Sequence, residues 1–360
     1  MSDRRKEAEE KMAKAIFISA DCWLCVFDLL EPSQLGLSIA LISHRFDFYV
    51  DEHFKTRRWA LKSMQIFANF KATGTVGVQS ANYHWKPMPI PQNQLPKKVV
   101  GFEAILIRYI NQNVLTFLHR FAQLFATNCP INLAINTDSD RILDCILHNI
   151  WPMVGQNIYV LELSPRSFRR LRKFVPSLLN ECPSLRFVSF YYGGIFAEFP
   201  CNDSANASSG QSVAKWLFTA LPNNVPKMYK CSLYIDYDEN WTSKIASFKA
   251  AFANASSSAN FIVVIWFLWS SAFSVAPFDQ TNGFTHEQLS LKRINSDCFL
   301  LIRCPIARDE SKWTKWEKEA IGWHFYDQWN QIDIRIYIEN HIGDGFSTQL
   351  PAQMISSRSE

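Results

Sequence analysis

Cys22 and Cys25 have the C-x-x-C spacing of redox-active dithiols and of half a zinc site. A structural zinc needs four ligands, and the next cysteine in the chain is Cys129. A thioredoxin-like pair would follow a strand, whereas residues 18–21 have only the composition of a helix start. A redox or metal site stays the alternative, but we interpret the two thiols as part of a core or surface helix.

Other candidate catalytic groups are few. Cys145 and His148 stand one helical turn apart in a segment with the apolar pattern of a packed helix, so we interpret them as core residues. The basic run RSFRRLRK at 166–173 could contact phosphate or an acidic peptide, although a solvated helix face is the simpler interpretation. Motifs for phosphate loops, serine nucleophiles and zinc proteases are missing from the sequence. We expect no enzyme activity, no cofactor and no metal ligands.

The composition is that of a globular protein. The chain has 360 residues, of which 48% are hydrophobic and 19% charged. A formal net charge of +4 is too small to predict a nucleic-acid partner. Nine widely scattered cysteines indicate reduced thiols, and the mixed-charge start MSDRRKEAEEKMAK lacks the apolar core of a secretory signal. We therefore expect a cytoplasmic or nuclear location.

One uncharged stretch, FIVVIWFLWSSAFSVA at 261–276, bears on membrane insertion. It is shorter than the roughly 20 apolar residues of a spanning helix, and serines interrupt it. It opens with β-branched and aromatic residues, which favour strands. We interpret it as a buried strand followed by a turn, and we expect no membrane partner.

Short apolar runs recur along the rest of the chain, with helical patterns between them. Four of the five intervals between their starts are 27 to 30 residues long, and the longest contains the Ser/Asn-rich stretch 201–212, an expected surface insertion. This alternation predicts stacked, right-handed units with parallel strands, similar to leucine-rich repeats; an ordinary open α/β domain is the alternative. The runs start at residues 131, 158, 186, 230, 260 and 287.

The predicted fold is therefore α/β, with an N-terminal three-helix module before an irregular leucine-rich-repeat-like solenoid. Near the C-terminus, SKWTKWEKEAIGWHFYDQW predicts a helix. IDIRIYIE at 332–339 alternates isoleucine with other residues, which predicts a strand with one wet face at a sheet edge. The expected parts are a disordered or helical tail at 1–14, the helical module at 15–66, a Pro-rich linker at 67–98, the α/β domain at 99–345 and a disordered tail at 346–360.

The helical module consists of three short amphipathic segments. Ser19 is placed to cap the first, and Glu31-Pro32 to end it. A Leu-rich second segment and an aromatic third segment, which ends at Trp59, follow. Helices of about ten residues bury too little surface to be stable alone, so we expect this module to need a partner.

Residues 18–59 carry a pattern that resembles the F-box family, and the nematode F-box proteins in particular. The likeness lies in ISADCWLCVFDLLEPSQLGLSIALISHRFDFYVDEHFKTRRW, with an acidic residue near the start, a Pro-containing turn, a Leu-rich second helix and a basic-aromatic third helix. RCPIARDESKWTKWEKEA at 303–320 is similar to the tail of that family. Ser19 stands where the family begins the motif with Pro, and Cys25 where a charged residue is usual.

The resemblance implies a non-catalytic, substrate-recognition subunit of a cullin-RING (SCF-type) ubiquitin ligase. The F-box would bind a Skp-family adaptor and, through it, a cullin, while the C-terminal domain would bind an unknown protein client. The alternative is a non-ligase interaction scaffold whose F-box has diverged at Ser19 and Cys25. The residues that the resemblance places against the adaptor are Ile18, Ser19, Asp21, Cys22, Val26, Leu30, Leu35, Leu41 and Ile42.

Overall fold

The structure is a computed structural model of a mixed α/β protein. It divides into two compact units, the first comprising residues 1–61 and 96–100 and the second residues 62–95 and 101–360. The predicted terminal tails lie outside the described residues. The structure describes residues 18–68, 75–79, 85–90, 98–126, 130–190, 193–234, 241–268 and 276–337.

The first unit is built from the three predicted helical segments. Ser19 caps the first as predicted, since its hydroxyl accepts a hydrogen bond from the Cys22 amide at 3.3 Å. That helix ends at Phe27, however, and Pro32 begins the second segment instead of ending the first. The elements are α2 (Ala20–Phe27), α3 (Pro32–Gln34), a π-helical turn η1 (Leu35–Ile39), a 3-10 turn η2 (Ala40–Ile42), α4 (His44–Thr56) and β1 (Trp59–Leu61), which pairs with β5 (Val99–Phe102).

Each helical segment contributes one side chain to a small core. Phe27, Leu35 and Val50 are at most 2% exposed. Around them, the Trp23 and Phe46 rings meet edge to face with their centroids 4.8 Å apart. Among the described residues of this unit, these three apolar side chains are the most deeply buried, so the core is small compared with that of a stable independent domain.

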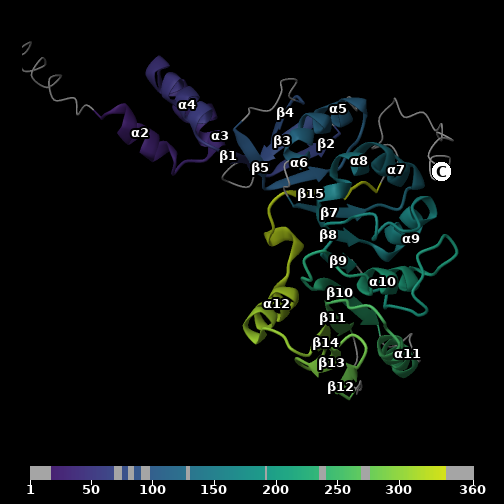
Figure 1. Ribbon diagram of the computed structural model, residues 1–360. Coiled ribbons are helices and arrows are strands. Elements are labelled where there is room, and N and C mark those ends of the chain that lie inside the picture. Colours follow the sequence, from purple (N-terminus) through teal and green to yellow (C-terminus); the bar gives the residue numbers. More distant parts are fainter. Residues whose placement is uncertain are drawn as a thin grey trace, which may run out of the picture. The chain divides into compact units, whose positions relative to one another are not determined.

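The second unit contains a large sheet, whose strands follow one another down Figure 1. The described residues form 13 strands, in the order β12-β13-β14-β11-β10-β9-β8-β7-β15-β6-β2-β3-β4. The strands from β11 to β2 are parallel to their neighbours, and antiparallel strands complete both edges. Their bounds are β12 (Phe278–Asn282), β13 (Glu287–Arg293), β14 (Cys298–Pro305), β11 (Phe261–Leu268), β10 (Lys227–Tyr234), β9 (Phe187–Phe190), β8 (Ile158–Leu163), β7 (Ile131–Asn136), β15 (Gln331–Arg335), β6 (Ala104–Ile107), β2 (Met64–Phe67), β3 (Thr75–Gln79) and β4 (Trp85–Met88).

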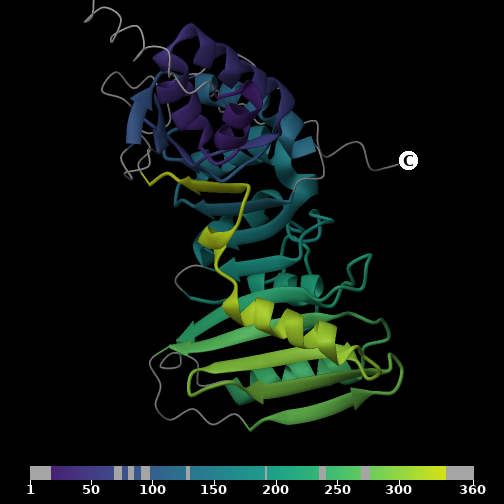
Figure 2. The same cartoon turned by 90° about the vertical axis from the view of Figure 1, so that its left-hand side faces the viewer.

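Helices cover both faces of this sheet. Figures 1 and 2 show α12 crossing one face, with helices α7 to α11 on the other. Among the described residues, no helix is both long and apolar enough to cross a membrane. The helices are α5 (Gln112–Arg120), α6 (Ala122–Ala126), α7 (Asp140–Cys145) with a π-helical turn η3 (Ile146–Ile150), α8 (Trp151–Val154), α9 (Pro165–Phe174), α10 (Ser209–Leu217), α11 (Trp241–Ala253) and α12 (Glu310–Gly322).

Five of the six predicted apolar runs are the consecutive parallel strands β7 to β11. Their near-continuous apolar sequences follow from burial on both faces of the sheet. The run at 287 is also a strand, β13, but the prediction that it continues the parallel series is wrong. Short turns at 283–286 and 294–297 connect it to β12 and β14, so it pairs antiparallel with both.

The prediction of an edge position for the C-terminal strand is also wrong. β15 lies inside the sheet, parallel to β6 on one side and β7 on the other. Asp333, on the face predicted to be wet, is 2% exposed. It lies 3.6 Å from Arg108 and accepts a hydrogen bond from Arg335 at 3.0 Å, so its charge is balanced where it is buried.

The segment predicted as a Pro-rich linker contributes to the sheet. β3 and β4 fall within residues 67–98 and pair antiparallel beside β2. Pro87 lies in the outermost strand β4, where a missing backbone donor costs no hydrogen bond to a second neighbour. The two compact units separate at Leu61 and Lys62, before this segment, and residues 96–100 at its end belong to the first unit again.

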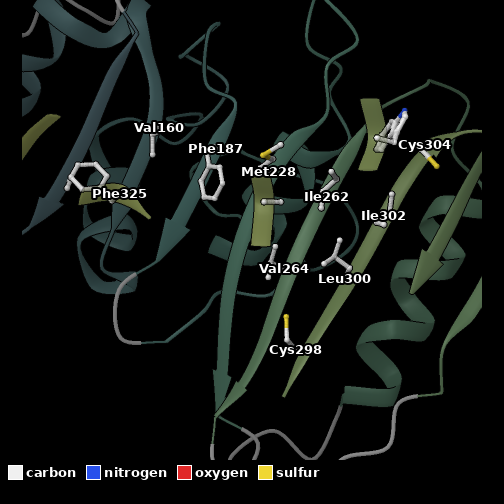
Figure 3. Close-up of a cluster of buried hydrophobic side chains, with 13 residues drawn as sticks. Val160, Phe187, Met228, Ile262, Val264, Cys298, Leu300, Ile302, Cys304 and Phe325 are labelled. Atoms are coloured by element: carbon white, nitrogen blue, oxygen red, sulfur yellow. The ribbon is translucent and has the colours of Figure 1, made fainter. Parts of the chain in front are cut away.

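The face under α12 holds a continuous apolar cluster. Figure 3 shows Val160, Phe187, Met228 and Ile262, from four adjacent strands, projecting from this face. Trp313 and Ala320 of α12 are buried in the same cluster. These contacts explain why α12 lies across the sheet. The helix predicted from SKWTKWEKEAIGWHFYDQW ends at Gly322, and only a 3-10 turn at Phe325–Asp327 follows.

Lys227, the first residue of β10, is a buried cation with a testable effect on stability. It is 3% exposed and donates a hydrogen bond to the Trp216 carbonyl. Burial lowers its pKa from 10.5 to about 7. Between these two values the unfolded chain binds a proton that the folded chain has lost, so the lysine makes the fold more stable as pH rises from 7 toward 10.5.

We therefore expect Lys227→Met to raise the melting temperature at pH 7, with a gain that shrinks toward pH 10. The corresponding gain in the free energy of unfolding at pH 7 should be on the order of 2 kcal/mol. Thermal unfolding followed by circular dichroism at pH 7, 8.5 and 10 measures it, with the exposed Lys215→Met as the matched control. An equal gain for both variants at every pH would contradict the assignment to Lys227.

Candidate functional site

Seven of the nine residues predicted to face a partner lie at the surface of the first unit. Leu30 is half-buried against the small core. Leu35 is 1% exposed and belongs to the core itself. Contrary to the prediction, it therefore packs inside the unit and does not face a partner. The seven exposed residues are Ile18, Ser19, Asp21, Cys22, Val26, Leu41 and Ile42.

Four of these exposed side chains are apolar, and we call Ile18, Val26, Leu41 and Ile42 the apolar surface of the first unit. Leu41 is 79% exposed, Ile42 62%, Val26 42% and Ile18 38%. Large aliphatic side chains exposed close together are typical of an interaction surface.

Polar contacts fix α2 and α4 side by side at both ends. At the start, Arg45 donates a hydrogen bond to the Ile18 carbonyl at 3.2 Å. At the end, Arg57 forms an ion pair with Asp28 at 3.1 Å. The two helices therefore run in the same direction, so Ile18, just before α2, lies near the start of α4. Leu41 and Ile42 come shortly before α4 in the chain and so lie near the same end.

His53 lies beside the second of these contacts. Its Nδ1 is 3.9 Å from Asp28, and burial lowers the pKa of the imidazole, although Asp28 opposes this shift. The ring packs edge to face on Phe27 with 5.9 Å between the centroids. The neutral imidazole thus belongs to the core between α2 and α4, as the amphipathic pattern of the third segment indicated.

Cys22 and Cys25 are both free and exposed on neighbouring turns of α2. The Cys22 sulfur accepts a hydrogen bond from the Ser19 hydroxyl at 3.2 Å. No group of three or more histidine, cysteine or acidic side chains within the described ranges is arranged to hold a metal ion. The two thiols therefore stand on the same helix as Val26 of the apolar surface.

In comparisons with known proteins, no protein-family model, no curated protein and no solved structure matches this chain.

Among the described residues of the first unit, three exposed apolar side chains were not in the predicted set. Leu29 is 85% exposed just after α2, Phe48 is 59% exposed on α4, and Val100 is 47% exposed in β5. The sequence could have indicated that either Leu29 or Leu30 is exposed, because two adjacent leucines at a helix end cannot both face the same core.

Proposed function

We propose that this protein is the substrate-recognition subunit of an SCF-type cullin-RING ubiquitin ligase. The first unit would bind a Skp-family adaptor, and the second unit would bind a protein client. The observation that carries the proposal is the apolar surface at residues 18, 26, 41 and 42, exposed on a small helical unit whose sequence resembles the F-box. In this role the protein itself performs no catalysis.

The energetics of the first unit support an obligate partner. Its own core buries three side chains fully, while the apolar surface stays in contact with water. A partner that covered these side chains would stabilise the unit by about 25 cal/mol for each Å² of apolar surface that it buried. Binding and stability of this unit would then be coupled.

For the second unit, we propose a repeat-like recognition domain. The strands β7 to β11 are consecutive in the chain and parallel, and helices α7 to α11 lie on one face, as in an irregular leucine-rich-repeat array. The insertion of β15 and the antiparallel edges depart from such an array.

Co-expression with a Skp-family adaptor tests the proposed function. We expect the full chain to elute with the adaptor as one complex in size-exclusion chromatography. Amide hydrogen exchange in residues 18–56 should slow in that complex, because partner binding raises the cost of opening the helices. A chain that stays adaptor-free, with these amides already protected, would contradict the proposal and favour a non-ligase scaffold.

A further inference from the structure

The second unit has a large cavity at the carboxyl ends of its central strands. Its volume is about 1140 Å³, and its lining includes Asn136 at the end of β7, Ser164 after β8, Gly194 after β9 and Leu233 near the end of β10. We call it the carboxyl-edge pocket. In open parallel sheets, ligands bind at this edge because the loops that follow the strands converge there.

The lining of the carboxyl-edge pocket is strongly basic. Five basic and two acidic side chains contribute to it. Three of the basic groups, Arg166, Arg169 and Lys173, recur at intervals of three and four residues along α9, so they share one face of the helix. From the first to the last, this row extends roughly 10 Å along the helix axis.

Arg169 and Lys173 are available to a ligand, whereas Arg166 already has an acidic partner. Arg166 lies 3.3 Å from Asp138, in a pair whose side chains are both largely exposed and which therefore contributes little to stability. Arg169 and Lys173 are exposed, and neither has an acidic side chain of the described residues within ion-pair distance.

A fourth basic residue, Arg172, builds the wall of the pocket. It is 6% exposed, and its guanidinium donates hydrogen bonds to the carbonyls of Ser204 at 3.1 Å and Ala207 at 2.8 Å. These contacts hold part of the stretch 201–212, predicted as a surface insertion, against α9. Burial lowers the pKa of Arg172, while the nearby Asp203 carboxylate opposes this shift, so Asp203 offsets part of the positive potential that Arg172 brings to the pocket.

The opposite wall depends on close backbone packing. A Cβ at Gly194 would lie 2.3 Å from the Cys231 sulfur and 2.7 Å from the Ser232 carbonyl oxygen. Gly193, beside it, has φ of 112°, a conformation that only glycine adopts readily. Gly194 therefore lies directly against β10 and lines the pocket together with Gly193.

We propose that the carboxyl-edge pocket binds a phosphate ester, with Arg169 and Lys173 as its direct ligands. A phosphate ester carries close to two negative charges at neutral pH, and arginine offers it a planar pair of donors. The ester could be a phosphorylated side chain of a bound protein or a free phosphorylated small molecule. The inference concerns the second unit alone, so it stands or falls separately from adaptor binding by the first.

Titration calorimetry on the full chain at low ionic strength tests this site. The probes are glycerol 3-phosphate and a short peptide with one phosphoserine, beside the same peptide unphosphorylated. We expect saturable binding of at least one phosphorylated probe, and a loss of about tenfold or more in Arg169→Ala/Lys173→Ala, since each charge-assisted hydrogen bond contributes roughly 1.5–3 kcal/mol. Tighter binding of the phosphopeptide would identify a protein source, and tighter binding of glycerol 3-phosphate a free ester.

The matched control is Lys315→Ala/Lys318→Ala, which removes two exposed cations from α12 on the other face of the sheet. It changes the net charge by the same amount, so binding should stay within twofold of the unmodified protein. Equal losses in both double variants would show general charge attraction and overturn the site. Absence of saturable binding of either phosphorylated probe would overturn it too.

Discussion

Leu41→Asp should abolish the stable complex with a Skp-family adaptor, and Val26→Asp should weaken it at least a hundredfold. Both side chains belong to the apolar surface of the first unit, at 79% and 42% exposure. In the complex each would become buried, and truncation of such an apolar anchor costs about 1–4 kcal/mol. A buried, unpaired carboxylate adds a further desolvation cost. Pull-down and calorimetry with the purified adaptor measure the loss.

The matched control is Phe284→Asp, which places the same charge at an 85% exposed aromatic position of the second unit. This variant should keep full affinity for the adaptor. All three variants should keep the melting temperature of the free protein, because none of the replaced side chains is buried. Unchanged adaptor affinity in both Leu41→Asp and Val26→Asp would place the interface elsewhere.

The second large effect concerns stability, at the buried ion pair between Glu287 in β13 and Arg303 in β14. Arg303 is fully buried and donates hydrogen bonds to the Glu287 carboxylate at 2.6 and 3.0 Å. The other carboxylate oxygen accepts the Ala259 amide at 2.9 Å. Glu287→Ala would leave the guanidinium buried without its counter-charge, so we expect a loss of about 3–5 kcal/mol in the free energy of unfolding.

Two further variants distinguish the effect of losing the ion pair from the general effect of mutating a strand residue. Asp279→Ala removes an exposed carboxylate from the neighbouring strand β12 and should cost less than about 0.5 kcal/mol. Glu287→Ala/Arg303→Met removes both charges and should recover a large part of the loss, because the methionine can pack between the Phe218 and Phe252 rings that now flank Arg303. Urea unfolding gives these free energies. A double variant as unstable as Glu287→Ala would contradict the account.

Local signals in the sequence were sufficient for the central strands and their helices. The repeat of apolar runs predicted β7 to β11, and Ser19 was correctly predicted to cap the first helix. Such features are set by neighbours in the chain, through burial on both faces and through a side-chain oxygen that accepts from a nearby amide.

Features that depend on distant residues were missed. The alternation around Asp333 predicted a wet face, because the sequence alone does not show that Arg108, 225 residues away, lies beside it. At the candidate site, Leu35 and Leu41 are chemically alike, and only the helix geometry decides that the first is buried and the second exposed. The carboxyl-edge pocket collects residues from several loops, so of its lining the basic run on α9 and the Ser/Asn-rich stretch 201–212 were visible as patterns.

The interior position of β15 has a consequence for synthesis. While the ribosome is still adding the last segments, β6 and β7 each present an unpaired inner edge, since the strand that joins them comes from residues 331–335. Open edges of this kind attract other chains and promote aggregation. A nascent chain stopped by a premature termination codon before residue 331 would keep that gap permanently, and cellular quality control should degrade it although nine-tenths of the polypeptide is present.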